Sequence, residues 1–411
     1  MQMEELFRVA LGLESPWRVE RVQFTEEAQR LELWLDFPAG SRFACPECGK
    51  RLCGAYDTTE RTWRHLNFFQ HATLLHARLP RVDCPEHGVK TVAVPWARPN
   101  VGFTLLMEAY ILLLIQSGMT PRQVARAIGE HDTRIWRLVH HYVDKARERA
   151  DFSEVRTVGV DETSRARGHD YISVFLDLLG PEQGRVLFAC EGKDADAIYR
   201  FAGDFIAHRG AIERVREVCS DMSRAYIKGV AEHLPQAALT FDRFHIMKLV
   251  NEAVDSVRRE EAAERPELKG TRYLWLKNTE NFTATQEIQF EQVKRLKCRT
   301  QRAWFLKTVL QEIYRSGTRE DGPRLLKAWC AWATRSRLPP MVEVSRMFRR
   351  HWAGVVRWFE SRISNGMLEA FNGLIQAAKR RARGFRSTAN LVAMVYLLFG
   401  KLDLRTPAPA R

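Results

Sequence analysis

The sequence has no apolar run long enough to cross a membrane. The stretch Ala109–Ile115 is apolar but short, whereas a spanning helix takes about 20 such residues. A secretory signal is also missing, and low-complexity sequence is confined to the Pro/Ala tail 406–411. These absences argue against membrane and secreted proteins and predict a cytoplasmic protein made of globular domains.

The cysteines do not form the regular framework of a disulfide-rich domain. Four of the eight, Cys190, Cys219, Cys298 and Cys330, stand singly in apolar or helical contexts. We therefore expect reduced thiols, as is usual in the cytoplasm.

Acidic residues do not outnumber basic residues in this chain. The 411 residues carry 64 Lys and Arg against 50 Asp and Glu, a formal net charge of +14. This balance favours nucleic acid as the partner. The length predicts two to four domains.

Two similar turns near the N-terminus carry metal-ligand residues. Cys45-Pro-Glu-Cys48-Gly and Cys84-Pro-Glu-His87-Gly each offer two ligands followed by a glycine. Four such ligands make a closed tetrahedral zinc site, which is structural because catalytic zinc keeps an open position. Cys53 is an alternative ligand without a partner at suitable spacing. A pair of turn cysteines with an unrelated surface histidine is the alternative to a zinc site. A small hairpin is expected before this pair, over 17–36.

The segment 99–150 is predicted to be helical. An apolar helix over Phe103–Gln116 is followed by Thr120-Pro121-Arg122-Gln123, a capped helix start, and Gly129 ends the second helix. A third begins near Asp132 and directs Arg134, Arg137 and His141 away from its apolar face. The pattern fits a DNA-reading helix-turn-helix, with an ordinary helical hairpin as the alternative.

Strands and helices alternate over residues 155–242, which predicts a mixed α/β core. Strands are expected near 155–161, 171–179, 185–190, 216–221 and 238–242, with helices near 194–208 and 223–233. Between about 260 and 355 strand signals vanish, and this block is predicted to be all helical.

Two aspartates follow apolar runs in the α/β segment. Asp161 comes after Val158-Gly-Val160, where we expect a strand end, and Asp221 follows Val218-Cys-Ser220. A carboxylate at a buried strand end needs a cation or hydrogen-bond donors. Helix capping is the competing role for Asp221, and strand alternation points Glu162 to the opposite face.

A third acid, Glu369, belongs to a helix expected over Ser364–Arg383. Leu368, Phe371, Ile375 and Ala378 are predicted to form its packed face, and Asn372, Gly373, Gln376 and Arg380 to share the flank of Glu369. A glutamate on a helix is most often only solvated. Here the helix ends in basic residues that suit DNA phosphates: Lys379, Arg380, Arg381, Arg383 and Arg386.

The motif Phe241-Asp-Arg-Phe-His245 adds a fourth acid and a histidine. Asp242 is a candidate to support the metal ligands, and His245 to contact DNA or assist proton transfer. Capping or packing is the alternative for His245.

Together these motifs resemble the ISL-three (ISL3) family of bacterial insertion-sequence transposases, one of the DDE groups. The resemblance covers nearly the whole chain, including Arg61-Thr-Trp-Arg-His-Leu66, Val160-Asp-Glu162, Ser220-Asp-Met222 and Glu369-Ala-Phe-Asn372. One departure is His87, where the family often has a fourth cysteine.

The resemblance implies a ribonuclease-H-like catalytic core interrupted by a helical insertion. Asp161, Asp221 and Glu369 would be catalytic and hold two Mg²⁺ ions, with Mn²⁺ as a substitute, for DNA cleavage and 3′-OH joining at terminal inverted repeats. Double-stranded DNA and a homodimer or higher oligomer are the implied partners, in the bacterial cytoplasm at the nucleoid. The expected domains are 1–98 (β/zinc-binding), 99–150 (helix-turn-helix), 151–258 (core, first part), 259–354 (helical insertion), 355–402 (core, second part) and 403–411 (tail).

Two other functions fit parts of the chain. A non-catalytic zinc and helix-turn-helix regulator leaves 151–400 unexplained. A RuvC-like RNA-guided nuclease also joins a zinc ribbon to three acids, but its ribbon generally lies between the last two acids, whereas here it comes first.

Overall fold

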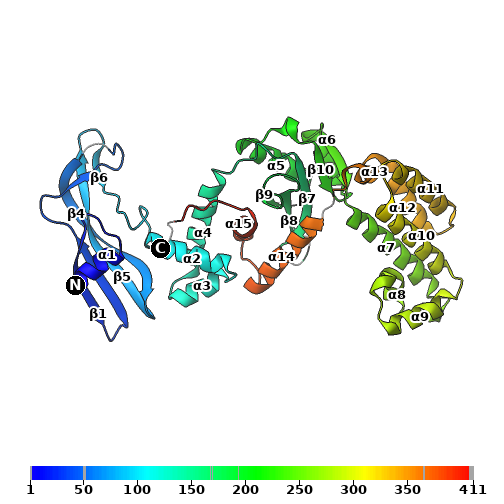
Figure 1. Cartoon of the computed structure of the whole chain (residues 1–411), viewed down its shortest axis with the longest axis horizontal. Helices are drawn as coiled ribbons and strands as arrows, with labels where there is room; N and C mark the ends of the chain where they lie inside the picture. The colour runs from blue at the N-terminus through cyan, green and yellow to red at the C-terminus, as the bar shows by residue number, and fades with distance from the viewer. Residues whose placement is uncertain are drawn as a thin grey trace. The chain divides into compact units, whose positions relative to one another are not determined.

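The computed structural model describes residues 2–49, 52–166, 168, 170–192, 194–363 and 366–406. The chain divides into two compact units. One contains the N-terminal part through Ala146 together with the chain's end from Asp403, and the other is Arg147–Leu402. Each unit is described by itself (Figure 1).

The first unit opens with a helix and a six-stranded sheet in the order β1-β2-β5-β4-β3, with β6 beside β5. The expected hairpin over 17–36 is confirmed, since β1 and β2 pair antiparallel. Trp17, Trp63 and Trp96 lie in the core of this part. The elements are α1 (Met3–Ala10), β1 (Arg18–Thr25), β2 (Arg30–Asp36), β3 (Arg42–Ala44), β4 (Leu52–Phe68), β5 (His71–Cys84) and β6 (Gly88–Thr91).

Three helices follow: α2 (Leu105–Gln116), α3 (Pro121–Ile128) and α4 (Asp132–Arg147). The predicted first helix begins two residues late because Thr104 caps it, accepting a hydrogen bond from the Met107 N–H. The predicted capping box at Thr120 and Gln123 is present. Gly129 ends α3 with φ +70°, a conformation that glycine adopts without strain.

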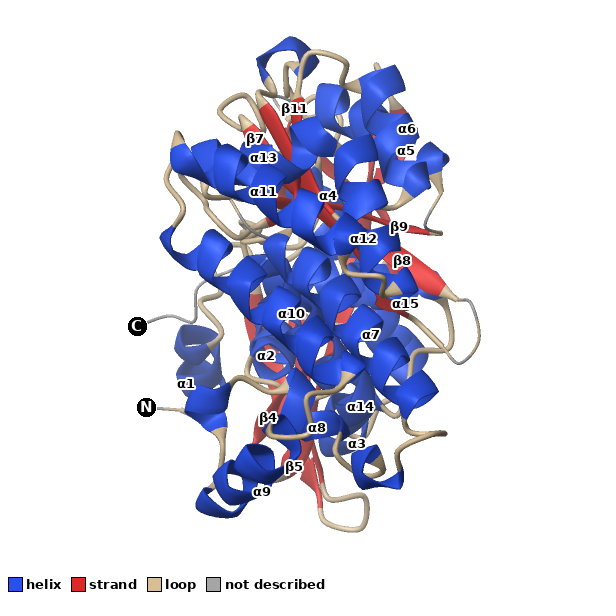
Figure 2. Ribbon diagram, turned by 90° about the vertical axis from the view of Figure 1, so that its right-hand side faces the viewer, coloured by secondary structure: helices blue, strands red, loops and turns tan. Residues whose placement is uncertain are grey.

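The second unit holds a five-stranded sheet in the order β11-β10-β7-β8-β9. Figure 2 labels four of these strands, β7, β8, β9 and β11. β7, β10 and β11 run parallel to one another, and β8 pairs antiparallel with β7 and β9. The predicted mixed α/β segment is confirmed, with small shifts at element ends. The elements are β7 (Thr157–Ser164), β8 (Tyr171–Asp177), β9 (Val186–Glu191), α5 (Ala195–Ala207), η1 (Ile212–Arg214), β10 (Glu217–Ser220), α6 (Arg224–His233), β11 (Ala238–Phe241), α14 (Gly366–Ala382) and α15 (Thr388–Phe399).

Helices alone make up the regular structure of the described residues from Arg243 to Ile363. The boundary expected between 258 and 259 lies inside α7, because Ile246, Val250, Val254 and Val257 form one continuous buried face. The boundary expected at 354 likewise lies inside α13. The elements are α7 (Arg243–Glu261), η2 (Pro266–Leu268), α8 (Arg272–Leu276), η3 (Thr279–Asn281), α9 (Ala284–Lys294), α10 (Arg299–Ser316), α11 (Asp321–Arg335), α12 (Pro339–Arg350) and α13 (Trp352–Ser361).

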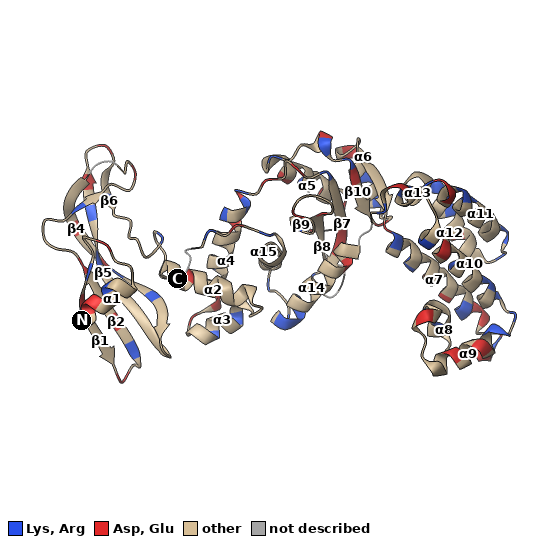
Figure 3. Cartoon of the chain, viewed as in Figure 1, with Lys and Arg blue, Asp and Glu red and all other residues tan. Residues whose placement is uncertain are grey.

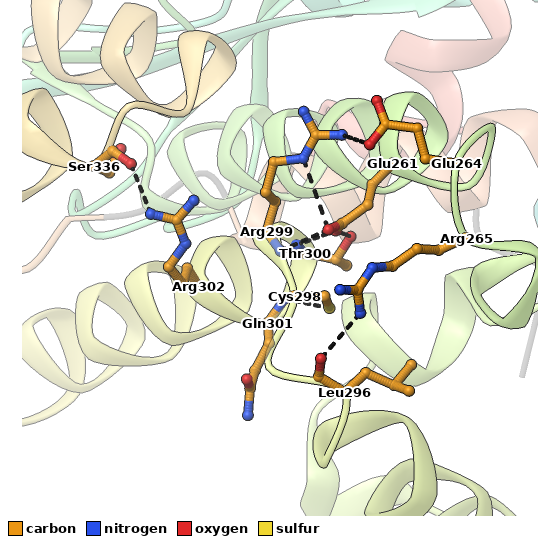
Figure 4. Close-up of polar contacts among 10 residues, drawn as sticks. All are labelled: Glu261, Glu264, Arg265, Leu296, Cys298, Arg299, Thr300, Gln301, Arg302 and Ser336. Atoms are coloured by element: carbon orange, nitrogen blue, oxygen red, sulfur yellow. Dashed lines mark hydrogen bonds and ion pairs between the residues drawn. The ribbon is translucent and has the colours of Figure 1, made fainter.

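The end of α7 is tied to the start of α10 by a buried carboxylate (Figure 4). Glu261 accepts hydrogen bonds from the Arg299 N–H at 2.8 Å, the Thr300 N–H at 2.7 Å and the Thr300 hydroxyl at 2.8 Å. Burial alone would raise the pKa of Glu261, but these donors together lower it. A negative charge at the first turn of a helix is also favourable to the helix dipole.

Candidate metal centres and DNA-binding surfaces

The four predicted zinc ligands meet at one place in the first unit. The ligand atoms of Cys45, Cys48, Cys84 and His87 all lie within 4.8 Å of one another. His87 Nδ1 is 3.9 Å from Cys45 Sγ and 3.6 Å from Cys84 Sγ. Three sulfurs and one imidazole nitrogen are a donor set suited to structural zinc.

The two turns have the same local geometry. Gly49 and Gly88, each following the second ligand of its turn, have φ values of +65° and +66°. Cys53, the alternative ligand, instead packs in the hydrophobic core of the sheet.

The strand register brings the aspartates of three parallel strands to one edge of the second sheet. Cys219 of β10 pairs with Gly159 of β7 on one side and with Thr240 of β11 on the other. Two residues further along the chain stand Asp161, which is still in β7, and Asp221 and Asp242, which directly follow the last residues of β10 and β11. Asp221 and Asp242 both raise the pKa of Asp161, so the three carboxylates lie close together at this edge.

The position of Asp161 within its strand differs from the prediction. It does not end its strand, because β7 continues to Ser164 by pairing with β8, and Asp161 is the partner of Val174. On the β10 side, however, pairing stops at Gly159. Asp161 therefore lies beyond the parallel part of the sheet while remaining only 7% exposed.

Both oxygens of Asp161 have hydrogen-bond donors. Oδ1 accepts from the Glu162 N–H at 2.8 Å, and Oδ2 accepts from the Asn372 amide at 2.8 Å. Burial raises the pKa of Asp161 to about 6, and the neighbouring Asp221 and Asp242 contribute to the rise. The two neutral donors and the attraction of His245 do not offset the desolvation of this carboxylate, so the site favours a further cation.

The neighbouring acids have local contacts of their own. Asp221 Oδ1 accepts the Ser223 N–H at 2.9 Å in the turn before α6, while the N-cap position of that helix is Ser223. Asp242 is fully buried and caps α7. His245 Nδ1 lies 3.1 Å from Asp242 Oδ2, and this hydrogen bond raises the pKa of His245 against the opposing effect of burial. The imidazole of His245 is thereby held beside the aspartates, and its protonated form is favoured relative to a free histidine.

Helix α14 packs over β7. A Cβ atom on Gly159 would come within 2.7 Å of Leu368 Cδ1, so the glycine permits this close approach. Leu368 and Ile375 are buried as predicted, whereas Phe371 and Ala378 are only half-buried. The predicted helix start at Ser364 lies outside the described residues.

The polar flank of α14 contacts the end of β7. In addition to the Asn372 bond to Asp161, the Gln376 amide donates to Thr163 Oγ1 and to the Ser164 carbonyl, both at 2.8 Å. The roles of Asn372 and Gln376 as partners of β7 were not predicted. Their spacing from Glu369, three and seven residues, was the available signal.

Glu369 is exposed and lines a cavity of 700 Å³ with residues of α7. Desolvation raises its pKa, and Asp242 adds to the rise while His245 and Lys248 oppose it. Glu369 therefore lies close enough to Asp242 for that carboxylate to raise its pKa. Within the described chain, the cysteine and histidine group is the one set of three or more such side chains whose ligand atoms all approach within 4.8 Å.

Comparison with known proteins identifies the family. A transposase family model matches residues 158–395, a model of the helix-turn-helix domain of transposase family ISL3 matches 92–143, and a model of the zinc-finger of transposase IS204/IS1001/IS1096/IS1165 matches 41–87. The transposase match alone covers more than half of the chain. This chain belongs to the ISL3 transposase family. It is a DDE-type transposase, which binds and cleaves DNA.

Two curated transposases are similar to this chain along nearly their whole length. The transposase for insertion sequence element IS1557 of Mycobacterium tuberculosis is 29% identical, over 97% of this chain and 96% of the relative. The transposase for insertion sequence element IS1001 of Bordetella parapertussis is 26% identical, over 92% of this chain and 94% of the relative. No helix in the described parts of the transposase is long and apolar enough to cross a membrane.

Basic residues gather at the C-terminal end of α14 (Figure 3), and their surroundings differ. Arg380, Arg381, Arg383 and Arg386 are exposed. Lys379 is half-buried, and its ammonium donates to the Ser164 carbonyl at 2.7 Å. Lys379 thus helps to fix α14 on β7 as well as adding positive charge.

The three candidate DNA-reading residues of α4 also differ. Arg134 forms an ion pair with Glu130, donates to the Gly102 carbonyl at 3.0 Å and lies 4.1 Å from the Phe103 ring centroid. Arg137 is exposed, while His141 is half-buried and its pKa is lowered by burial and by Arg98. Of the three, Arg137 is the side chain most accessible to a DNA groove.

Proposed function

We propose that Asp161, Asp221 and Glu369 are the catalytic DDE residues and that together they hold two Mg²⁺ ions, with Mn²⁺ as a substitute. The observation that carries this proposal is the register of β7, β10 and β11, which places aspartates side by side at one sheet edge. Carboxylate oxygen is the ligand type that Mg²⁺ prefers. A metal pair there would activate the attacking oxygen and neutralise charge on the leaving oxygen.

The protein's own residues would position and support these ligands. Asn372 and the Glu162 N–H orient the two oxygens of Asp161. His245 and Asp242 form a hydrogen-bonded pair beside them, with Asp242 buried and His245 half-buried, and this pair is suited to holding a proton close to the reacting phosphate. This arrangement gives Asp242 and His245 a supporting role rather than a ligand role.

The fold we infer for Arg147–Leu402 is a ribonuclease-H-like core interrupted by a helical insertion. The five-stranded sheet, α14 and α15 would be the core, and the helices from α7 to α13 the insertion. The zinc domain 1–98 and the helix-turn-helix domain 99–150 precede it. The zinc site would be closed and structural, holding one ion and stabilising its domain.

The substrate we infer is double-stranded DNA at the terminal inverted repeats, followed by joining of the 3′-OH end to target DNA. Arg380, Arg381, Arg383 and Arg386, with Lys379, would contact the phosphate backbone. Arg137 would read bases, with Arg134 and His141 supporting α4. Synapsis of two ends implies a homodimer or larger assembly, acting at the nucleoid in the bacterial cytoplasm.

The test is Mg²⁺-dependent cleavage of a duplex carrying the terminal repeat that flanks the gene. Asp161→Asn, Asp221→Asn and Glu369→Gln should each lower the rate by at least about 100-fold, since each removes a ligand charge from the metal pair. Glu162→Gln is the matched control, because its side chain alternates to the other face of β7. Wild-type turnover by any of the three variants would remove that residue from the site.

A further inference from the structure

The first unit carries a hairpin tip that is exposed and aromatic. β4 ends at Phe68 and β5 begins at His71, so Phe69 and Gln70 form the turn between them. Phe69 is 80% exposed, and its ring centroid lies 4.6 Å from that of Phe68, which is 40% exposed. Large apolar side chains that gather on a surface mark a site of interaction more often than isolated ones do.

The backbone of Phe69 is strained. Its φ of +51° lies in the left-handed region, which glycine adopts freely and a bulky residue adopts only at a cost. Because the ring is mostly exposed, packing inside the protein offsets little of that cost. Strained residues cluster at functional sites, so a contact with another molecule best explains a phenylalanine at this position.

The hairpin is fixed to the helix-turn-helix by Arg64 of β4, which is 6% exposed. Its guanidinium donates to the Thr73 carbonyl of β5 at 3.4 Å and to the Ile128 carbonyl at the end of α3 at 3.3 Å. Its backbone N–H donates to the Gly102 carbonyl at 2.9 Å, and its carbonyl accepts from the Thr104 N–H at 3.1 Å. One buried residue therefore joins the hairpin to the segment before α2 and to the end of α3.

The hairpin tip lies beside the part of a helix-turn-helix that reads DNA. The first residues of the recognition helix contact base edges, and here Ile128 ends α3 and Asp132 begins α4. At about 3.3 Å per residue, Phe69 lies roughly 15 Å beyond Arg64 along the hairpin. Half a turn of B-DNA, which separates a major groove from the next minor groove, is about 17 Å. The tip is therefore long enough to reach the minor groove next to the groove that α4 occupies.

The charge of α3, next to the hairpin, favours a polyanion. α3 contains two basic residues, Arg122 and Arg126, and no acidic residue. Both arginines are exposed, and because they are four residues apart on a helix they lie on one face of it. A duplex held by the helix-turn-helix would therefore meet positive charge close to the tip.

The acidic turn of the neighbouring hairpin lies on the other side of the tip. Glu26 and Glu27, both exposed, belong to the turn between β1 and β2. In the sheet, β5 and β2 lie on one side of β4. On the opposite side of β4, Phe103 forms a bridge to Arg64. β5 therefore separates the acidic turn from β4, and we expect DNA to approach the tip from the β4 side.

We propose that the tip of the β4–β5 hairpin is a second DNA-contacting element, which enters the minor groove beside the major groove that α4 reads. Phe69 lies in the groove, and the side-chain amides of Asn67 and Gln70 face the base edges. Proteins that bind the minor groove combine apolar side chains with Asn and Gln in this way. The proposal rests on the proposed function, because the terminal repeat is the duplex that α4 is inferred to read.

The test is binding of full-length Asp161→Asn protein to terminal-repeat duplexes with single modified bases. Diaminopurine in place of adenine adds an amino group to the minor groove, and inosine in place of guanine removes one, while the major-groove edges stay unchanged. Deazaguanine, which lacks the N7 acceptor, locates the major-groove contacts of α4. We expect minor-groove changes to alter the affinity at least about 5-fold in one block, roughly five base pairs from the major-groove block.

Two variants separate DNA contact from a structural role. Phe69→Gly removes the ring and the strain together, so it should not lower the melting temperature. It should nevertheless weaken terminal-repeat binding at least about 5-fold and abolish the minor-groove block. Tyr56→Ala is the matched control, since Tyr56 is a 65% exposed aromatic residue near the opposite end of β4 and should change neither quantity.

Three results would overturn the proposal. These are minor-groove changes without effect at every position, the same minor-groove pattern in Phe69→Gly as in the parent protein, and equal terminal-repeat affinity of these two proteins. If Phe69→Gly instead changes only the sedimentation of the DNA-free protein, the tip is a contact between two copies of the chain and the proposal is wrong.

Failure of the proposed function gives a different result. The parent protein would then bind terminal-repeat and random duplexes equally, whereas failure of the present proposal leaves the preference for the repeat intact. Even without such a preference, Phe69→Gly should weaken binding to both duplexes, because the tip contacts any duplex that α4 holds.

Discussion

At the residue scale, the charge of Asp161 is in conflict with its surroundings when no metal is bound. The side chain is buried beside two other aspartates, and its hydrogen-bond donors are a backbone N–H and a neutral amide. The attraction of nearby His245 lowers the pKa of Asp161 but does not outweigh its burial. Such a carboxylate lowers the stability of the metal-free fold and is stabilised by a cation. Asp161 would therefore serve metal binding while lowering the stability of the metal-free fold.

We predict that Asp161→Asn raises the melting temperature of the metal-free transposase at pH 8. Removal of the buried charge should stabilise the fold by about 1–3 kcal/mol, since the raised pKa reports a penalty of that order. Differential scanning calorimetry in EDTA measures it. A lower melting temperature than wild type would show that Asp161 is instead compensated within the protein.

Glu261 illustrates the opposite case, a carboxylate that stabilises. Its pKa is lowered in the folded protein, so its contribution is fully present above the unfolded value of 4.5 and is lost as the pH falls through the folded pKa. We predict that Glu261→Gln lowers the free energy of unfolding by about 1–3 kcal/mol at pH 7. The difference from wild type should shrink as the pH falls below 4.5.

Thermal unfolding of both proteins as a function of pH measures this effect. Glu264→Gln is the control, because Glu264 also pairs with Arg299 but is 72% exposed and should contribute little. A Glu261→Gln effect that stays constant down to pH 3 would contradict the assignment.

At the scale of elements, much of the fold follows from the sequence. Apolar alternation located β1 and β2, and the Thr120 capping box and Gly129 located α3. The strand-end position predicted for Asp161 was wrong, because the partner that extends β7 is β8, and pairing between strands is not visible in one strand's residues. The continuity of α7 across the expected boundary at 258 was not visible for a similar reason, since the residues that pack against this helix lie far along the chain.

The candidate site was predictable only in part. Residue types and the ends of apolar runs indicated Asp161 and Asp221, but their side-by-side placement depends on register between strands. The donors that hold Asp161 come from α14, more than 200 residues away, and no local pattern reports such a contact. The unlike surroundings of Arg134 and Arg137 also depend on tertiary contacts.

Gly159 links two elements, since it allows α14 to approach β7. We predict that Gly159→Ala slows cleavage although it removes no polar group, because Leu368 must move and displace the helix that bears Glu369 and Asn372. Overpacking of this kind costs about 1–3 kcal/mol. Cleavage kinetics and melting temperature are the measurements.

Gly203→Ala is the control, since a Cβ there meets nothing within 4 Å. The double variant Gly159→Ala with Leu368→Ala should recover part of the lost rate. Equal rates for wild type and Gly159→Ala would show that α14 tolerates displacement.

At the scale of the whole molecule, phosphate binding and base reading are assigned to different parts of the chain. Arg380 and Arg381 of α14 are proposed to bind phosphates, and Arg137 of α4 to read bases. We predict that neutralising Arg380 and Arg381 weakens binding to repeat and random DNA alike and reduces the salt dependence, because fewer counterions are released. Arg137→Ala should preferentially weaken binding to the terminal repeat, by about 1–3 kcal/mol. Titrations on both DNAs at two salt concentrations distinguish the two effects.

The Arg134→Ala variant tests whether Arg134 supports the fold of α4 as well as DNA binding. Because Arg134 binds Glu130 and the Gly102 carbonyl, its loss should lower the melting temperature of the first unit as well as DNA affinity. If Arg137→Ala weakens both DNAs equally, Arg137 contacts only the backbone, and end recognition lies elsewhere, for example in the zinc domain.

The central claim is that Asp161, Asp221 and Glu369 bind a pair of divalent cations. Anomalous scattering from a crystal of the transposase with terminal-repeat DNA and Mn²⁺ tests it most directly. We predict two Mn²⁺ peaks roughly 3.5–4 Å apart, with Asp161 as a ligand and with Asp221 and Glu369 completing the set. Mn²⁺ bound without Asp161, or a crystal complex in which Glu369 remains away from the metal, would contradict the account.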